Sequence, residues 1–219
     1  MPRITEERRE ARREQILDAA RACLLEHGLE AVSMEMIIAR SGMSTGAVYR
    51  YFKGKDEIIG AAVAASASEI GAAVAPILIN PTSRLPSQLV EELLAAWVDY
   101  SRSGVGAAAG IDRMPAALHG WSYAQTDAEL KAVLRASLRG FREACVPIIK
   151  RWQADGVVAT GVEPDAVAQL LLSISLGFVA QRSLTGDADV QAHVDALAAL
   201  AAAQPAHRAR PAEPDVAAP

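Results

Sequence analysis

At 219 residues, the chain is long enough to bury a core of its own in one or two domains. Ala, Leu, Val and Ile supply most of its 51% hydrophobic residues, aromatic residues make up 5%, and alternating β-branched runs are missing, so the composition favours an all-α protein. The net charge of −4 gives no general signal for a nucleic-acid partner, but residues 1–60 hold ten Lys or Arg and ten Asp or Glu, so the acidic excess lies entirely in the rest.

The N-terminal part is expected to form three helices, at about residues 5–27, 33–40 and 44–51. Each begins at a Ser or Thr that can accept a hydrogen bond from the first turn. Gly28 follows the first helix as its stop, and Gly42 lies in the turn between the second and third, where a positive φ is easiest for glycine. The spacing therefore predicts a compact three-helix unit.

The remainder continues with a helical pattern. A long helix begins at Lys55 and breaks at Asn80-Pro81, and the later helices are expected at about residues 86–103, 106–124, 127–156, 164–184 and 187–203. The Pro- and Ala-rich residues 204–219 carry no helical pattern and are expected to be disordered.

The longest apolar stretch, Ile58 to Ile79, has the length of a membrane span. It holds Glu69 and is mostly Ala and Gly, so we expect a packed helix and no contact with a membrane. Two cysteines make no disulfide framework, and the charged N-terminus has no apolar segment of a signal peptide, which suits a cytoplasmic protein.

Residues 33–58, SMEMIIARSGMSTGAVYRYFKGKDEI, read as helix, four-residue turn and helix. Ile37, Met43, Val48 and Phe52 are expected to make the apolar contacts between these helices and the first one. The residues left for the outer faces are small, hydroxylated, aromatic or basic: Thr45, Gly46, Ala47, Tyr49, Arg50 and Tyr51. Such a face suits a DNA major groove, because small residues allow close approach while hydroxyls and Arg bind phosphates or bases.

The run from Gly42 to Ile58, G-M-S-x-G-x-V-Y-x-Y-F-x-x-K-x-x-I, resembles the signature of the TetR family of transcriptional regulators, and the resemblance is strong over residues 10–60. A weaker likeness to the ligand-binding part of one large subgroup continues at Leu118, Trp121 and Ala124, at 127–130 and at Leu176-Gly177. The resemblance implies a DNA-binding domain in residues 1–55 and a helical ligand-binding and dimerisation domain in residues 56–203.

The resemblance also implies operator contacts by position. Ser33 and Glu35 would lie at the start of the second helix. Ser44, Thr45, Gly46, Ala47 and Arg50 would face the DNA from the third, while Tyr49, Tyr51 and Lys55 would hold phosphates. Glu35 is acidic where some relatives use Arg to read guanine, and a Glu there can accept from a cytosine amine instead.

Two alternatives stay open in this part of the chain. Tyr49 and Tyr51 can be core aromatics, although adjacent odd positions do not share one helix face and Phe52 already takes the inward place. The basic cluster of the first helix either touches phosphate or forms an ordinary solvated face paired with neighbouring Glu residues; its members are Arg8, Arg9, Arg12 and Arg13.

The later helices concentrate large side chains that are candidates for an apolar pocket: Trp97, Tyr100, Met114, Trp121, Phe141 and Cys145. The alternative is that they fill a plain core. The helix expected at about residues 127–156 also carries a stripe of basic residues. Either this stripe is solvated, or its Arg139 turns inward to hold an anionic ligand. A redox role for Cys145 finds no resolving cysteine nearby, and the G-x-G-x-x-A match at residues 104–109 follows a helix instead of the strand that a dinucleotide site needs.

Residues 166–180, AVAQLLLSISLGFVA, are apolar nearly all round, so their helix must be buried on more than one side. Together with a stripe on the last helix, they predict a four-helix interface between two subunits; the candidate contacts are Leu170, Leu171, Ile174, Phe178, Val190, Val194 and Leu197. A purely intramolecular core is the alternative.

These patterns predict a ligand-responsive repressor that binds a palindromic operator as a homodimer and is released by a small, largely apolar molecule. A ligand-dependent activator is the nearest alternative. A helical enzyme or carrier is the other, but no nucleophile–base pair, metal-ligand cluster or phosphate loop supports it, so we expect no cofactor and no metal.

Overall fold

The computed structural model describes residues 6–104 and 112–202, and every regular element within them is a helix. The helices are α1 (Glu6–Ala31), α2 (Met34–Ser41), α3 (Thr45–Val48), α4 (Lys55–Ile79), α5 (Pro86–Arg102), α6 (Met114–Tyr123), α7 (Ala128–Ala154), α8 (Pro164–Thr185) and α9 (Val190–Ala202). The expected all-α fold is confirmed. Residues 204–219, expected to be disordered, and most of the G-x-G-x-x-A segment lie outside the described residues; the helix α5 precedes that segment.

Local signals in the N-terminal unit agree with the sequence in part. α1 continues past its expected stop to Ala31, with a kink at Gly28, and Ser44 precedes α3 without a side-chain cap hydrogen bond. The Ser33 side chain caps α2 by accepting from the Met36 amide at 3.3 Å, and Gly42 ends it in the left-handed conformation at φ +65°. The third helix is shorter than expected, because after Val48 its residues continue to Tyr51 as tighter turns, such as the bond from the Arg50 amide to the Ala47 carbonyl.

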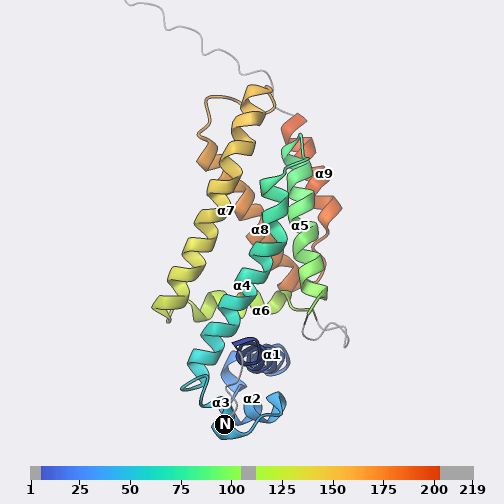
Figure 1. The fold of residues 1–219 in the computed structure, drawn as a ribbon. Coiled ribbons are helices and arrows are strands. Elements are labelled where there is room, and N and C mark those ends of the chain that lie inside the picture. The colour runs from blue at the N-terminus through green and yellow to red at the C-terminus, as the bar shows by residue number, and fades with distance from the viewer. Residues whose placement is uncertain (1–5, 105–111, 203–219) are drawn as a thin grey trace, which may run out of the picture.

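The described residues form two hydrophobic cores, joined by α4 (Figure 1). The N-terminal core gathers Ile16, Ile37, Val48 and Phe52 from α1 to α3 and the turn that follows, and it also takes Ile58, Ile59 and Ala62 from α4. The boundary expected at residue 55 therefore divides the chain at the start of α4, while the packing of the N-terminal unit reaches one to two turns further.

The second core lies among the remaining helices. α7 packs on α4 and α8, and α5 packs on α4, α8 and α9. α6 lies across the end of this bundle, between it and α1 (Figure 1). Gly120 permits its close approach to α4, since a Cβ there would lie 2.7 Å from Cγ1 of Val63. α6 thus contacts both parts of the molecule.

By length and composition, α4 and α8 are apolar enough to cross a membrane. Each packs against several helices of the molecule, and α4 carries Glu69, which pairs with Arg21 and Arg113. The sequence expectation that α4 is a packed helix agrees with these contacts.

Candidate DNA-binding surface and ligand cavity

The N-terminal unit presents one face of small, polar and basic side chains. Ser44, Thr45, Gly46 and Arg50 are exposed, Ala47 is half-buried, and Val48 beside them is fully buried. Alternation of this kind follows from the helical period, which turns Val48 into the core and its neighbours outward. The outward side chains of α3 and its following turn are mostly small or polar, which is the composition that close approach to DNA bases requires.

The two tyrosines of this face differ in exposure. Tyr49 is 50% exposed, whereas Tyr51 is half-buried and packs against the N-terminal core. Phe52 fills the inward place as expected, at 3% exposure. The Tyr49 side chain therefore points outward. The Tyr51 side chain packs at the edge of the N-terminal core and remains partly exposed.

At the start of α2, Ser33 and Glu35 lie together. The hydrogen bond with Ser33 lowers the pKa of Glu35, so this exposed carboxylate is charged at neutral pH. Lys55 is the first residue of α4, directly after the Gly54 N-cap. These positions agree with the helix termini that the sequence predicts for them.

Some of the basic residues of α1 form the solvated ion pairs that the sequence allows as one alternative. Arg9 and Arg13 pair with Glu6 and Glu10 at 3.9 and 3.8 Å, while the Arg13 guanidinium also lies 5.4 Å from the centre of the Phe52 ring. Arg8 and Arg12 are exposed. Such surface pairs are weak and leave the side chains free to exchange a carboxylate for a phosphate.

The second part of the molecule encloses a cavity of about 440 Å³. Its walls come from α1, α4, α5, α6, α7 and α8, and they are largely apolar. Trp97, Tyr100, Trp121 and Phe141 all line it, and the rings of Trp97 and Tyr100 meet edge to face with centroids 6.0 Å apart. The four aromatic residues expected around a pocket are thus brought together.

Three other candidates for the pocket lie elsewhere. Met114 and Cys145 are fully buried in the second core and do not line the cavity. Arg139 is exposed on α7 and does not line it either, so its side chain is solvated and the inward alternative is wrong. Burial raises the pKa of the Cys145 thiol to about 12, which keeps it protonated and unreactive.

Sequence reasoning missed the part of the cavity wall that α4 supplies. Its members are small residues about one turn apart, Ala62, Ser66, Ala67, Gly71 and Ala75. Because the side chains on this face of α4 are small, they leave a space that the side chains of the facing helices do not fill. The Ala- and Gly-rich composition of α4 was the available signal.

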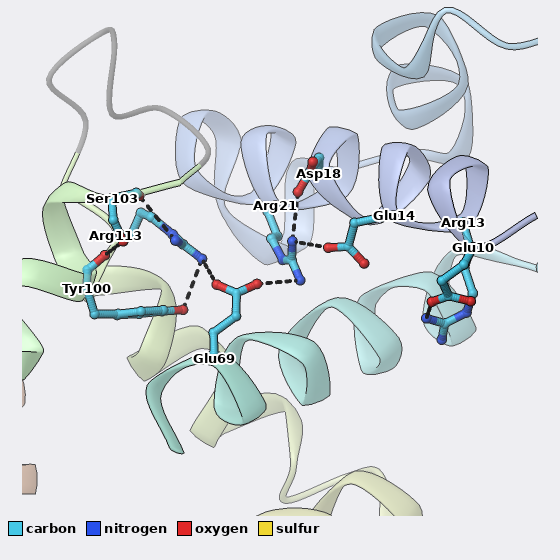
Figure 2. A network of polar contacts seen from close by, with 9 residues as sticks. All are labelled: Glu10, Arg13, Glu14, Asp18, Arg21, Glu69, Tyr100, Ser103 and Arg113. Atoms are coloured by element: carbon cyan, nitrogen blue, oxygen red, sulfur yellow. Dashed lines mark hydrogen bonds and ion pairs between the residues drawn. The ribbon is translucent and has the colours of Figure 1, made fainter. Parts of the chain in front are cut away.

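One end of the cavity is polar, and Figure 2 shows its side chains. Arg21 from α1 and Arg113 from the start of α6 both line the cavity, and their guanidinium groups are held by Glu69 of α4. Arg113 also donates to the Tyr100 hydroxyl at 3.1 Å and lies 4.4 Å from the centre of that ring. No pattern in the sequence indicated this cluster.

Residues expected at a dimer interface divide into two groups. Leu171 and Phe178 are buried inside the second core and Val194 is buried on α9, so they stabilise one subunit and do not face a partner. Leu170 is 57% exposed; Ile174, Val190 and Leu197 are half-buried against the same core. Within residues 6–104 and 112–202, no group of three or more His, Cys, Asp or Glu is placed to hold a metal ion.

Comparison with family models gives two matches. Residues 16–62 match the model of "Bacterial regulatory proteins, tetR family", and residues 107–206 match that of "BetI-type transcriptional repressor, C-terminal". A curated relative, the HTH-type transcriptional repressor Rv1474c of Mycobacterium tuberculosis, is 32% identical over 148 residues, which are 66% of this chain and 73% of the relative. The HTH-type transcriptional regulator BetI of Pectobacterium atrosepticum is 28% identical over 44% of this chain and 49% of its own.

Solved structures show the same fold. A TetR transcription regulator from Haloarcula marismortui aligns with a TM-score of 0.70 at 19% identity, over 89% of this chain and 98% of that one. GusR of Salmonella enterica aligns at 0.64 and 22% identity, over 91% and 97%. SmeT in complex with triclosan aligns at 0.63 and 23% identity, over 87% and 91%.

Proposed function

The chain belongs to the TetR family of transcriptional regulators, and we propose that it is a cytoplasmic repressor that binds an inverted-repeat operator as a homodimer and leaves it when a small, largely apolar molecule enters the cavity. One observation supports this most. α4 begins with Lys55 beside the DNA-facing surface and then supplies a wall of the cavity, so one rigid element joins the two sites.

For DNA, we assign the operator contacts to the exposed face around α3. Thr45, Gly46 and Ala47 approach the bases, and Ser44 and Arg50 flank them. Tyr49 and Lys55 bind phosphates, and Tyr51 does so from the edge of the packed core. Ser33 and Glu35 reach the DNA from the N-terminus of α2.

For the effector, the cavity sets the chemistry. Its volume of about 440 Å³ falls in the range of small-molecule sites, and its largely apolar walls favour an apolar or aromatic molecule. Binding energy then comes mainly from buried apolar surface, at about 25 cal/mol per Å² before the cost of ordering. No cofactor or metal is needed for this function.

For the dimer, we assign the contact to an outward stripe of α8. Leu170 and Leu184 are 57% and 77% exposed, and Ser173 and Gly177 lie on the same face between them. A Cβ at Gly177 would meet nothing within 4 Å, so this face is open to close approach by a second copy. The exposed side of α9, with Leu200 71% exposed, extends the stripe.

The experiment is selection of genomic fragments on the immobilised protein, followed by footprinting of the recovered promoters. We expect two protected half-sites about one helical turn apart, or a multiple of it. A panel of hydrophobic compounds, triclosan included, is then screened for release of the operator. Protection of one asymmetric half-site by a monomer would contradict the dimer, and a reporter that falls when the gene is deleted would indicate an activator.

The dimer is tested by the double substitution Leu170→Glu and Leu184→Glu. Opposed like charges on the stripe should give a folded monomer that no longer binds the operator. Val133→Glu is the matched control, because Val133 is also an exposed apolar residue, on α7 and outside the cavity wall. A dimer of ordinary size from the double variant in sedimentation would place the interface elsewhere.

A further inference from the structure

A single carboxylate holds together three helices at the junction of the two parts. Oε1 of Glu69 lies 3.0 Å from Nη2 of Arg21, and Oε2 lies 2.8 Å from Nη2 of Arg113 (Figure 2). The two arginines are 7% and 4% exposed, whereas the carboxylate is partly open to solvent. Glu69 on α4 therefore connects α1 of the DNA-binding unit with α6 under the bundle.

The arginine on the DNA-binding side depends on Glu69 for its contact with the other part. Nη1 of Arg21 binds Glu14 and Asp18, both on α1 itself and both at 2.7 Å. Among the described residues, its remaining ion pair is the one with Glu69. Burial lowers the pKa of Arg21, but the three carboxylates reverse this and raise it above the ordinary value, so the group stays charged.

The arginine on the cavity side is held by the end of α5. Its Nη1 donates to the Ser103 carbonyl at 3.1 Å, and its Nη2 donates to the Tyr100 hydroxyl at 3.1 Å. The Tyr100 ring lies against the guanidinium and also forms part of the cavity wall. The same ring therefore contacts both the space of the cavity and the Arg113 guanidinium.

We propose that Glu69 is the positioning residue through which the occupancy of the cavity changes the orientation of the DNA-binding helices. This rests on the function proposed above. Occupancy displaces Tyr100 and Arg113; Glu69 is then drawn away from Arg21, and α1 loses its ionic contact with α4. Because Glu69 neither lines the cavity nor lies near α3, its removal should uncouple the two sites without destroying either.

In the test, a larger side chain introduced by mutation occupies the cavity in place of the unidentified effector. Ala117 of α6 is half-buried in its wall, so Ala117→Trp fills part of the space with an indole. In the otherwise natural protein, we expect this substitution to weaken operator binding by about tenfold or more, within the usual range of coupling between two sites. With Glu69→Gln also present, the same substitution should change operator affinity by less than about threefold.

Two further variants serve as controls. Glu92→Gln removes a carboxylate that lines the same surface groove as Glu69 but pairs with no arginine among the described residues. In this background, Ala117→Trp should still weaken operator binding. Gly104→Ala disturbs the ion pair between Glu69 and Arg113 from the Arg113 side, because a Cβ at residue 104 would lie 2.3 Å from Nη1 of Arg113. Like Glu69→Gln, it should reduce the loss of operator affinity that Ala117→Trp causes. Circular dichroism and melting verify folding, and Ala67→Leu is a smaller filler if the indole unfolds the chain.

The outcomes separate the two proposals. An indole effect that is equally large with and without Glu69 contradicts the role of Glu69 and leaves the sensing function intact. A cavity filler that changes operator binding in no background contradicts the sensing function, and this inference with it. If Ala117→Trp also fails to weaken operator binding in the Glu92→Gln background, the effect depends on the general negative charge near Glu69. That result would contradict the role of the Glu69 ion pairs.

Discussion

The two cores of this molecule are built from similar residues but packed to different degrees. In the N-terminal unit, Ile37, Val48 and Phe52 are almost fully buried and pack in one closed cluster. The second part has more large side chains, yet it surrounds an opening of about 440 Å³. In the proposed function, the closed core supports the DNA-facing surface, and the open one gives up close packing to admit an effector.

The helix α4 makes this change along its own length. Ile58 and Ile59 complete the N-terminal core, and about two to three and a half turns later Ser66, Ala67 and Gly71 face the cavity instead. A single helix is thus a close-packed element at one end and a thin wall at the other. The proposed connection between operator and effector rests on this continuity, and Glu69 lies in the part of α4 where its packing changes.

The largest expected effect tests whether the cores differ in solution. Ile37→Ala should reduce the free energy of unfolding by about 2–5 kcal/mol, because it opens a void in a closed core. Phe141→Ala should cost less than about 2 kcal/mol, since one side of that ring already faces the cavity. Urea unfolding followed by circular dichroism measures both. Equal costs would mean that the cavity is filled by rearranged side chains.

The sequence was sufficient for the elements whose chemistry is local. The caps at Ser33 and Asp127, the left-handed Gly42 and the proline that begins α8 all depend on neighbours a few residues away. A helix lies in every expected region, although α3 is shorter than expected and α6 begins at Met114 instead of near residue 106. The DNA-facing surface is of this kind as well. Its residues lie on one short segment, so helical periodicity alone separates Val48 from its exposed neighbours.

The dimer stripe shows where periodicity fails. Because α8 is apolar nearly all round, the pattern could not tell the side toward the bundle from the side left outward. Leu171 and Phe178 were expected at the partner and are found in the subunit's own core, while Leu184, outside the expected set, is the most exposed of these residues.

The cavity shows a second limit. A large apolar residue looks the same in the sequence whether it fills a core, as Met114 and Cys145 do, or faces a void, as Trp121 does. The difference is decided by the residue opposite, which is distant along the chain. The bridge of Glu69 to Arg113 joins residues 44 positions apart and was invisible for the same reason.

A second prediction sharpens the comparison at the cavity wall. With a compound identified by the panel, Trp121→Ala should weaken binding about tenfold, because the indole contributes apolar contact area. Arg139→Ala should leave affinity within about twofold, since that side chain is solvated. Isothermal titration measures both variants. A strong loss in Arg139→Ala for an acidic compound would return that residue to the binding site.

A third prediction concerns the closed unit. Lys55→Ala should weaken binding to all operator sequences alike and lower the slope of log affinity against log salt by about one, as expected for one phosphate contact. Lys150→Ala, exposed on α7 away from the DNA-facing surface, should leave the slope unchanged. Fluorescence anisotropy at several salt concentrations gives both slopes. A change of base preference in Lys55→Ala would indicate a base contact.

The smallest expected effect is a pH dependence carried by Cys145. Burial raises the pKa of this thiol to about 12 in the folded protein, whereas the unfolded chain deprotonates it near pH 9. Above about pH 9 the unfolded state therefore binds fewer protons than the folded one, and the stability that the thiol contributes at lower pH is lost as the pH rises. From about pH 8 to pH 9.5 this loss should stay under about 1 kcal/mol.

Other groups titrate in the same range, so the measurement is a difference. Urea unfolding of the natural protein and of Cys145→Ala at both pH values separates the constant cost of the lost packing from the part that depends on pH. The natural protein should lose more stability than the variant between the two values. Identical losses would mean that the thiol is reached by solvent in the native state and that the second core opens around it. In that case Ellman's reagent should modify native Cys145 at pH 8, and the packing next to the cavity would be looser than in the N-terminal core, where Cys23 is also buried.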